Sequence, residues 1–279
     1  MDVLVFTTLV AAGSFGAGLL GSLTGLGGGV VLVPMLTLAF GVDVRYAIGS
    51  SLVSVIATSS GAASAYVREG YSNIRVGMFL EIATSIGALL GAFLAARIPT
   101  PAIAIVFGLM LLYSAWQSLR PQKRRSEADS PPDRIAGLLK LDSNYPTSEG
   151  RQSYHVQRVP IGFGLMLGAG ALSGLLGIGS GALKVLAMDR AMLLPFKVST
   201  TTSNFMIGVT AAASAGVYFR KGYIDPGLSM PVVLGVLAGS IVGARLLMQA
   251  QVKTLRLVFG LVILVLAVEM IYSGVNGRL

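Results

Sequence analysis

The chain has 279 residues, of which 54% are apolar and only 12% are charged, and its mean hydropathy is +0.77. Because soluble globular proteins have about 25% charged residues, most of this surface faces something other than water. Cysteine is absent and histidine occurs once, at His155, so disulfides are excluded and neither a metal site nor histidine-based catalysis is expected. The net charge of +9 does not indicate nucleic-acid binding, because eight basic residues fall in one connecting segment, between Arg120 and Arg158.

The composition therefore predicts an all-α polytopic membrane protein, whose helices each need about 17–25 residues to cross the hydrocarbon core. The first stretch, 3–23, has neither the basic n-region nor the A-x-A-like cleavage site of a secretory signal, so we expect a retained helix. Further stretches of sufficient length follow at 46–66, 76–96, 198–219, 228–248 and 254–273, and those at 101–118 and 160–176 are near the lower limit.

Two apolar segments, 29–40 and 181–195, are too short to cross a membrane, and each follows a glycine cluster directly. Short, glycine-interrupted segments at corresponding places in two halves are typical of the discontinuous helices of transporters. We therefore expect one short broken or re-entrant helix in each half of the chain.

The segment 120–158 is polar, basic and rich in proline, and it separates a first transmembrane repeat, 1–119, from a second, 159–279. Its positive charge predicts an aqueous linker on the cytoplasmic side. Within it, Ile135 to Leu141 has the composition of a short surface helix, but nothing there indicates a folded domain.

An internal repeat is the most informative feature of the sequence. A shift of 152 residues aligns the two halves without a gap from Gly16 to Leu111, and it matches Tyr66-Val-Arg-Glu-Gly-Tyr with Tyr218-Phe-Arg-Lys-Gly-Tyr. Glycine richness alone produces some matches, but not this ungapped register. The sequence therefore indicates a duplicated unit of about five hydrophobic segments.

The relative orientation of the two repeats depends on the short segments. If these are re-entrant, the chain has 8 spanning helices and parallel halves; if they complete a crossing, it has 10 and the halves are inverted. The matched loops 68–75 and 220–225 are both net basic, which favours the same side, whereas Lys197 and Lys253 argue for the inverted arrangement. The sequence favours eight.

The two glycine clusters are the first candidate binding site, at Gly27, Gly28 and Gly29 and at Gly179, Ser180 and Gly181. Unwound backbone inside a membrane is tolerated only where it is buried in protein or lines a wet cavity. The short helix that follows each break offers free N–H groups and a positive dipole end, which suit an anion. The alternative is that these glycines only allow close helix packing.

Polar residues open the next helix in each half. Ser50 and Ser51 in the first half align with Thr202 and Ser203 in the second, within a polar run that also contains Thr201 and Asn204. Hydroxyl and amide groups could coordinate an oxyanion, or they could stabilise helix contacts at about 0.6 kcal/mol each. We favour a cavity lining for this run and helix contacts for scattered hydroxyls such as Thr210.

Lys184 and Glu81 are the ionisable candidates inside the predicted membrane region. Lys184 lies within the short segment 181–195, where its counterpart in the first half is Leu32, and intramembrane lysines are expensive and usually functional. Snorkelling to the interface or pairing with Asp189 are the alternatives. Glu81 is the acidic candidate for proton coupling, although its place near the start of 76–96 favours an interfacial position.

These residues resemble the duplicated signature of the sulfite exporter TauE/SafE family, also called the toluene sulfonate uptake permease family. The matching motifs are Gly-Leu-Gly-Gly-Gly followed by Pro34, the segment from Leu172 to Lys184, and the run from Lys197 to Gly208. One departure is that Leu186 occupies the position equivalent to Pro34, which puts a kink there in doubt. The resemblance covers about residues 10–115 and 160–270.

The resemblance implies a multi-pass carrier of a prokaryotic plasma membrane that transports a small sulfur-containing anion, such as sulfite, a sulfonate or sulfoacetate. It implies membrane lipid as a partner and no cofactor, and it leaves a homodimer, the direction of transport and the coupling ion open. An anion channel or an assembly factor of the same fold is the alternative. An enzyme is not expected, because the acidic residues of the hydrophobic body, such as Glu81 and Glu269, are isolated.

Overall fold

The computed structural model is mostly helical and describes residues 3–24, 28–68, 70–119, 133–147, 150–247 and 252–277. Each of the predicted spanning segments forms a helix whose ends differ from the prediction by a few residues. In the first half the elements are α1 (Val3–Thr24), α2 (Gly29–Pro34), the π-helix η1 (Met35–Ala39), α3 (Val44–Arg68), α4 (Ile74–Ala95) and α5 (Thr100–Leu119).

The second half contains the same elements in the same order, which agrees with the repeat in the sequence. They are α7 (Val159–Leu176), α8 (Gly181–Leu186), the π-helix η2 (Ala187–Ala191), α9 (Phe196–Arg220), α10 (Pro226–Leu247) and α11 (Val252–Val275). A π-helix follows both Pro34 and Leu186, so this irregularity does not depend on proline. Within the described residues, α1, α4, α7 and α10 contain spans long and apolar enough to cross a membrane.

The two halves pack into one another. Helix α4 of the first half lies along α7 of the second, α1 lies along α10, and the pairs α3–α9 and α5–α11 also cross between the halves. Glycines allow the close approach: a Cβ atom at Gly87 would overlap the carbonyl oxygen of Leu167, and one at Gly239 would overlap that of Phe15. These two contacts are equivalent under the 152-residue shift, so the same packing occurs twice.

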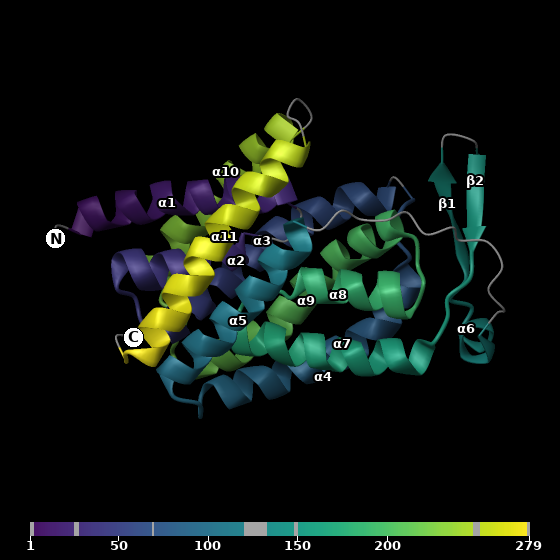
Figure 1. Ribbon diagram of the computed structural model, residues 1–279, viewed down its shortest axis with the longest axis horizontal. Helices are drawn as coiled ribbons and strands as arrows, with labels where there is room; N and C mark the ends of the chain where they lie inside the picture. Colours follow the sequence, from purple (N-terminus) through teal and green to yellow (C-terminus); the bar gives the residue numbers. More distant parts are fainter. Residues whose placement is uncertain are drawn as a thin grey trace.

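Equivalent helices begin at opposite ends of the molecule. In Figure 1 both termini lie on the left and α6, β1 and β2 lie on the right, so α1 starts on the left whereas α7 starts on the right. The matched loops 68–75 and 220–225 also lie near different parts of the molecule. In the first loop Arg75, which follows the end of α3, donates a hydrogen bond to Lys140 O of the linker. In the second, Tyr223 packs edge-to-face against Tyr46, at the start of α3. The expectation that these loops lie on the same side is therefore wrong.

The described part of the linker contains a helix and a β-hairpin, which the sequence did not predict beyond the short surface helix. Helix α6 spans Arg134–Leu138, and β1 (Ser143–Thr147) pairs antiparallel with β2 (Gly150–Tyr154). Asn73 attaches this region to α4, because its side-chain amide donates to Leu141 O and to the Tyr154 hydroxyl, both at 2.8 Å. Burial raises the pKa of that phenol to about 12.

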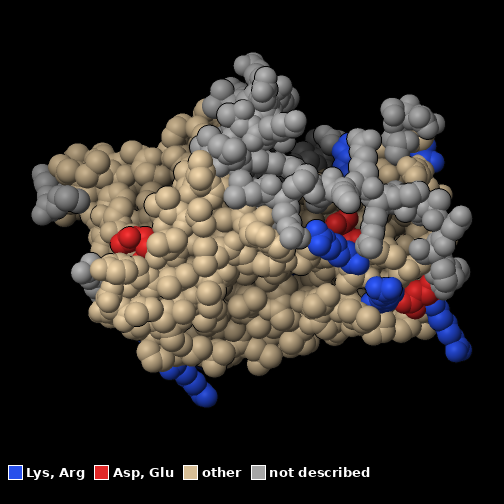
Figure 2. Space-filling model, in the orientation of Figure 1, with Lys and Arg blue, Asp and Glu red and all other residues tan. Residues whose placement is uncertain are grey.

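Charged residues are sparse over the helical body. On the face shown in Figure 2 they lie mainly towards the end that contains α6, β1 and β2, with a few towards the opposite end. The exposed side chains of α4 illustrate the uncharged part, since Met78, Ile82, Leu90 and Phe93 are each more than half exposed. An apolar belt of this kind matches lipid rather than water.

The contact between α4 and α7 gives a test of the packing. A Cβ at Gly91 would overlap the carbonyl oxygen of Ala171, whereas one at Gly168, on α7, would have no atom within 4 Å. Because overpacking forces backbones apart, we expect Gly91→Ala to lower the unfolding free energy in detergent by about 1–3 kcal/mol. The matched variant Gly168→Ala should leave it unchanged, and equal thermal stability of the two would contradict this packing.

Candidate functional site

The two glycine breaks meet inside the helical body. Gly177 ends α7 with a φ of 68°, and Gly179 and Ser180 also have positive φ, at 67° and 44°. Ser51 Oγ of α3 donates to Gly177 O at 2.8 Å, and a Cβ at Gly29 would lie 3.2 Å from that same carbonyl oxygen. The start of α2 and the break before α8 are therefore neighbours, as expected for a shared site.

Ser180 is the unusual residue of this region. It precedes α8 in the left-handed conformation, which is uncommon for a residue with a Cβ. Its side chain is 2% exposed, and within the described part of the chain its Oγ has no hydrogen-bond partner. An unpaired buried hydroxyl is unfavourable, so this one is available to a bound polar ligand.

The first break is described only in part. Gly27 lies outside the described residues, while Gly28 is buried in right-handed helical conformation, and its carbonyl accepts from Val31 N and Leu32 N. Gly181 in the second break is buried, and its carbonyl accepts from Ser203 Oγ at 3.2 Å. The carbonyls of Gly28, Gly177 and Gly181 are therefore paired within the protein.

Lys184 is completely buried on α8, so it does not snorkel to an interface. Its ammonium donates to Thr210 Oγ1 of α9 at 2.6 Å. The Thr210 hydroxyl in turn donates to Glu81 Oε1 of α4 at 2.7 Å, and this carboxylate oxygen also accepts from Ser85 Oγ at 3.0 Å. A continuous Lys184–Thr210–Glu81 chain of hydrogen bonds therefore joins three elements from both halves.

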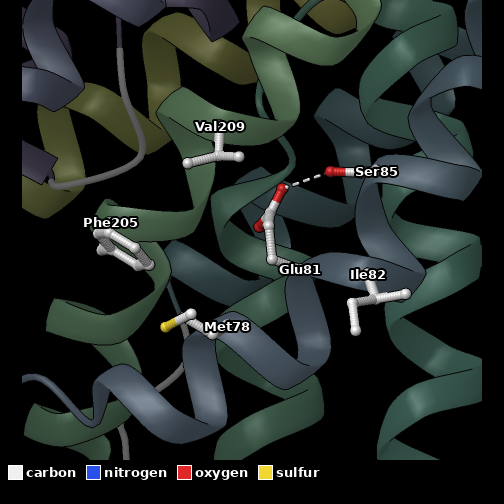
Figure 3. A pocket seen from close by; sticks show the side chains of 6 residues that line it. All are labelled: Met78, Glu81, Ile82, Ser85, Phe205 and Val209. Atoms are coloured by element: carbon white, nitrogen blue, oxygen red, sulfur yellow. Dashed lines mark hydrogen bonds between the residues drawn. The ribbon is translucent and has the colours of Figure 1, made fainter.

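Glu81 occupies a different environment from the interfacial one predicted. Its side chain is 7% exposed, because α4 continues for roughly two turns before it and α9 packs over it. Figure 3 shows Glu81 and Ser85 beside a cavity of about 390 Å³ whose other lining residues are Met78, Ile82, Phe205 and Val209. Within the described residues, Glu81 Oε2 has no hydrogen-bond partner.

The other predicted site residues are engaged elsewhere. Ser50 Oγ lies 3.1 Å from Ser229 Oγ of α10. Thr201 Oγ1 donates to Tyr71 O, and Thr202 Oγ1 accepts from Asn73 N, so both hydroxyls attach α9 to the loop before α4. Asn204 is half-buried on the same helix. Within the polar run, these contacts support an anchoring role for Thr201 and Thr202.

The buried charges occur in only one of the two equivalent environments. The 152-residue shift replaces Lys184, Thr210 and Glu81 by Leu32, Thr58 and Val233. Among the residues that the structure describes, the Thr58 hydroxyl donates to backbone carbonyls of its own helix, Ser54 O and Val55 O. Sequence reasoning assigned Thr210 to helix contacts and did not connect it with the two ionisable residues. One signal in the sequence could have linked Lys184 with Glu81: the equivalent positions in the other half, Leu32 and Val233, are both uncharged.

The chain matches sequences named as probable membrane transporters over nearly its whole length. The family model described as sulfite exporter TauE/SafE matches residues 10–270. Among the curated relatives, the probable membrane transporter protein YunE of Bacillus subtilis is 27% identical over 97% of this chain and 98% of its own length. The probable membrane transporter protein MJ0441 of Methanocaldococcus jannaschii is 24% identical over 97% of each chain. No solved structure gives a significant match.

Removing the Thr210 hydroxyl tests the buried chain. Thr210→Val leaves the ammonium of Lys184 and the carboxylate of Glu81 without their bridge, which we expect to cost about 1–3 kcal/mol in unfolding free energy. Thr58→Val is the matched control, since its hydroxyl bonds only to its own helix, and Thr210→Ser should restore stability. Thermal unfolding in detergent measures all three, and a Thr210→Val protein as stable as Thr58→Val would contradict the bridge.

Proposed function

Because this chain belongs to the sulfite exporter TauE/SafE family of membrane transporters, we propose that it carries a small sulfur-containing anion across a prokaryotic cell membrane by alternating access. The substrate class is of the sulfite, sulfonate or sulfoacetate type. The observation that carries the proposal is Lys184, a fully buried cation one turn after the break at Ser180. Inside a membrane a buried lysine is costly, and lysines retained there commonly mark a substrate or ion pathway.

We assign the anion site to the break before α8. Lys184 supplies the charge, and Ser180 Oγ supplies an unused hydrogen-bonding group. Hydrogen bonds to charged partners are worth about 1.5–3 kcal/mol each. A tetrahedral or pyramidal oxyanion can accept several of them at once, and this favours oxyanions over halides.

The arrangement of the halves supports alternating access. We propose that the repeats are inverted, because each short segment returns its chain to the end from which α1 or α7 started, so that each half makes an odd number of passes. The elements that meet at the site come from both halves, α4 from the first and α8 and α9 from the second. Rocking of one half against the other would then expose the site to each side in turn.

The distribution of basic residues supports one orientation. Arg75, Lys197 and a linker segment with eight basic residues lie at one end, whereas Arg45, Arg220 and Lys221 lie at the other, so the balance of basic charge favours the linker end. By the positive-inside rule this end is cytoplasmic, so both termini lie on the opposite side. Lys197 and the linker are then on the same side, which the parallel arrangement could not explain.

Transport by purified protein in liposomes tests the proposed function. We expect saturable uptake of radiolabelled sulfite or of at least one sulfonate from a panel that includes methanesulfonate. Lys184→Met should lower the apparent affinity about 10- to 100-fold, the equivalent of one or two charged hydrogen bonds. Lys197→Met is the matched control, because Lys197 is exposed and contacts the Tyr71 ring.

The outcomes separate the alternatives. Unsaturable flux would indicate a channel. Absence of flux for every anion in the panel would contradict the proposed function. Saturable uptake with the same apparent affinity in wild type and in Lys184→Met would support the proposed function but refute the assignment of the anion site to Lys184.

A further inference from the structure

We propose that Glu81 is a proton-binding site whose protonation frees Lys184 for the transported anion, so that each anion moves together with one proton. This inference rests on the proposed function and goes beyond it by naming the coupling ion and its residue. It depends on the buried Lys184–Thr210–Glu81 chain and on the unpaired carboxylate oxygen at its end.

The transported anion and the carboxylate of Glu81 compete for one cation, the ammonium of Lys184. Without substrate, the positive charge of Lys184 is balanced by Glu81 through the Thr210 hydroxyl, over hydrogen bonds of 2.6 and 2.7 Å. An anion that binds to Lys184 while Glu81 stays ionised would leave two negative charges against one positive charge. In a medium of low dielectric constant this imbalance is strongly unfavourable.

A proton removes the imbalance. When H⁺ adds to the carboxylate of Glu81, the site consists of a neutral acid, the ammonium of Lys184 and the bound anion, and its net charge is again zero. Binding of the anion and of the proton therefore favour each other, and the coupling is reciprocal by thermodynamic necessity. The empty site and the fully loaded site are both neutral, and a neutral site is what a carrier needs in order to cross between its two states cheaply.

The geometry provides a place for the proton. Glu81 Oε1 accepts from both Thr210 and Ser85, whereas Oε2 has no hydrogen-bond partner in the described residues. Glu81 lines the pocket of about 390 Å³ in Figure 3, while Oε2 itself is buried and unpaired, so a proton on this oxygen leaves the bridge to Thr210 intact. A proton on Oε2 therefore adds to the site and does not dismantle it.

Few other charged groups face Glu81. Helix α7, which packs along α4, contains no ionisable residue. On α9 the ionisable residues lie towards the ends, at Lys197, Tyr218 and Arg220, and α4 itself has only Arg75 besides Glu81. Lys184 of α8 is the charge that reaches Glu81 through a hydrogen bond.

A sodium ion fits the same place less well. Carboxylate and hydroxyl oxygens suit a hard cation, but the Thr210 hydroxyl already accepts from the ammonium of Lys184 at 2.6 Å. A metal cation beside that ammonium would meet a like charge. We therefore assign the coupling to protons and expect a sodium gradient to drive no accumulation.

The test uses methanesulfonate, whose charge does not change across the neutral pH range. In proteoliposomes, wild type should accumulate methanesulfonate when the outside is more acidic, and a sodium gradient should have no effect. Once Glu81 is mostly ionised, each further pH unit should raise the half-saturating concentration about tenfold, because the binding-competent fraction falls tenfold. When the pH is equal on both sides, the half-saturating concentration for exchange of internal for external methanesulfonate should rise with pH in the same way.

Glu81→Gln imitates the protonated acid and keeps an oxygen that can accept from Thr210 and Ser85. We expect its exchange activity to persist and to lose the tenfold dependence per pH unit, while accumulation driven by the pH gradient disappears. Persisting exchange also shows that the variant is folded. Glu269→Gln is the matched control, since Glu269 is an exposed acid of α11 outside this chain of hydrogen bonds.

Several outcomes would overturn the proposal. One is that Glu81→Gln accumulates methanesulfonate with the same pH dependence as wild type. A second is that Glu269→Gln loses this pH dependence to the same extent as Glu81→Gln. A third is that a sodium gradient drives accumulation. A Glu81→Gln protein that fails in exchange is compared with Glu81→Asp, which should recover proton-driven accumulation if the carboxyl group is what matters. If wild type transports no anion of the panel, the proposed function is wrong. If wild type transports an anion independently of pH, the function stands and only the proton coupling is wrong.

Discussion

The rest of the structure depends on how the protein satisfies backbone groups where two helices break inside the membrane. In hydrocarbon an unpaired carbonyl or N–H is costly, so a break requires partners supplied by the protein. Helix α3 supplies Ser51 to the carbonyl of Gly177, and α9 supplies Ser203 to the carbonyl of Gly181. The two long, relatively polar helices are therefore required beside the breaks, and the glycines allow them to approach closely.

Pairing of charge follows from the same constraint. A lysine that is fully buried on α8 must be compensated, and the compensating acid lies on α4, in the other half of the chain. The two are joined through Thr210 of α9, the helix that packs against both α4 and α8. Close packing between the halves and the buried charges are thus parts of one arrangement. The equivalent environment around Leu32 and Val233 keeps the packing and lacks the charges.

The sequence predicted the helices well, because hydropathy over long apolar stretches is a strong signal. It also located both breaks, through glycine clusters placed before segments too short to cross. It could not determine which helices are neighbours, since the apolar surfaces of α4, α7 and α10 are alike in composition. It favoured parallel halves from two basic loops, yet loops at opposite ends of a membrane protein can both be basic. The β-hairpin escaped detection because its strands, such as Ser143–Thr147, are short and polar.

The site was predicted in part. Lys184 and the break at Ser180 were identified from residue type and position, whereas the partnership of Lys184 with Glu81 depends on Thr210, which lies 129 positions from Glu81 in the chain. Thr201 and Thr202 were assigned to the site by composition, but their hydroxyls contact the loop before α4. Polar residues in a membrane helix thus separate into binding and anchoring groups only when their partners are known.

The absence of cysteine allows the most direct measurement of the central claim, that an anion binds at the break beside Ser180 and Lys184. A single cysteine introduced as Ser180→Cys can be labelled with a cationic methanethiosulfonate reagent in the presence and absence of methanesulfonate. The account predicts that methanesulfonate slows labelling, and that it does so more at acidic than at alkaline pH. Labelling of this cysteine that is unaffected by any transported anion, in protein that still transports, would contradict the account.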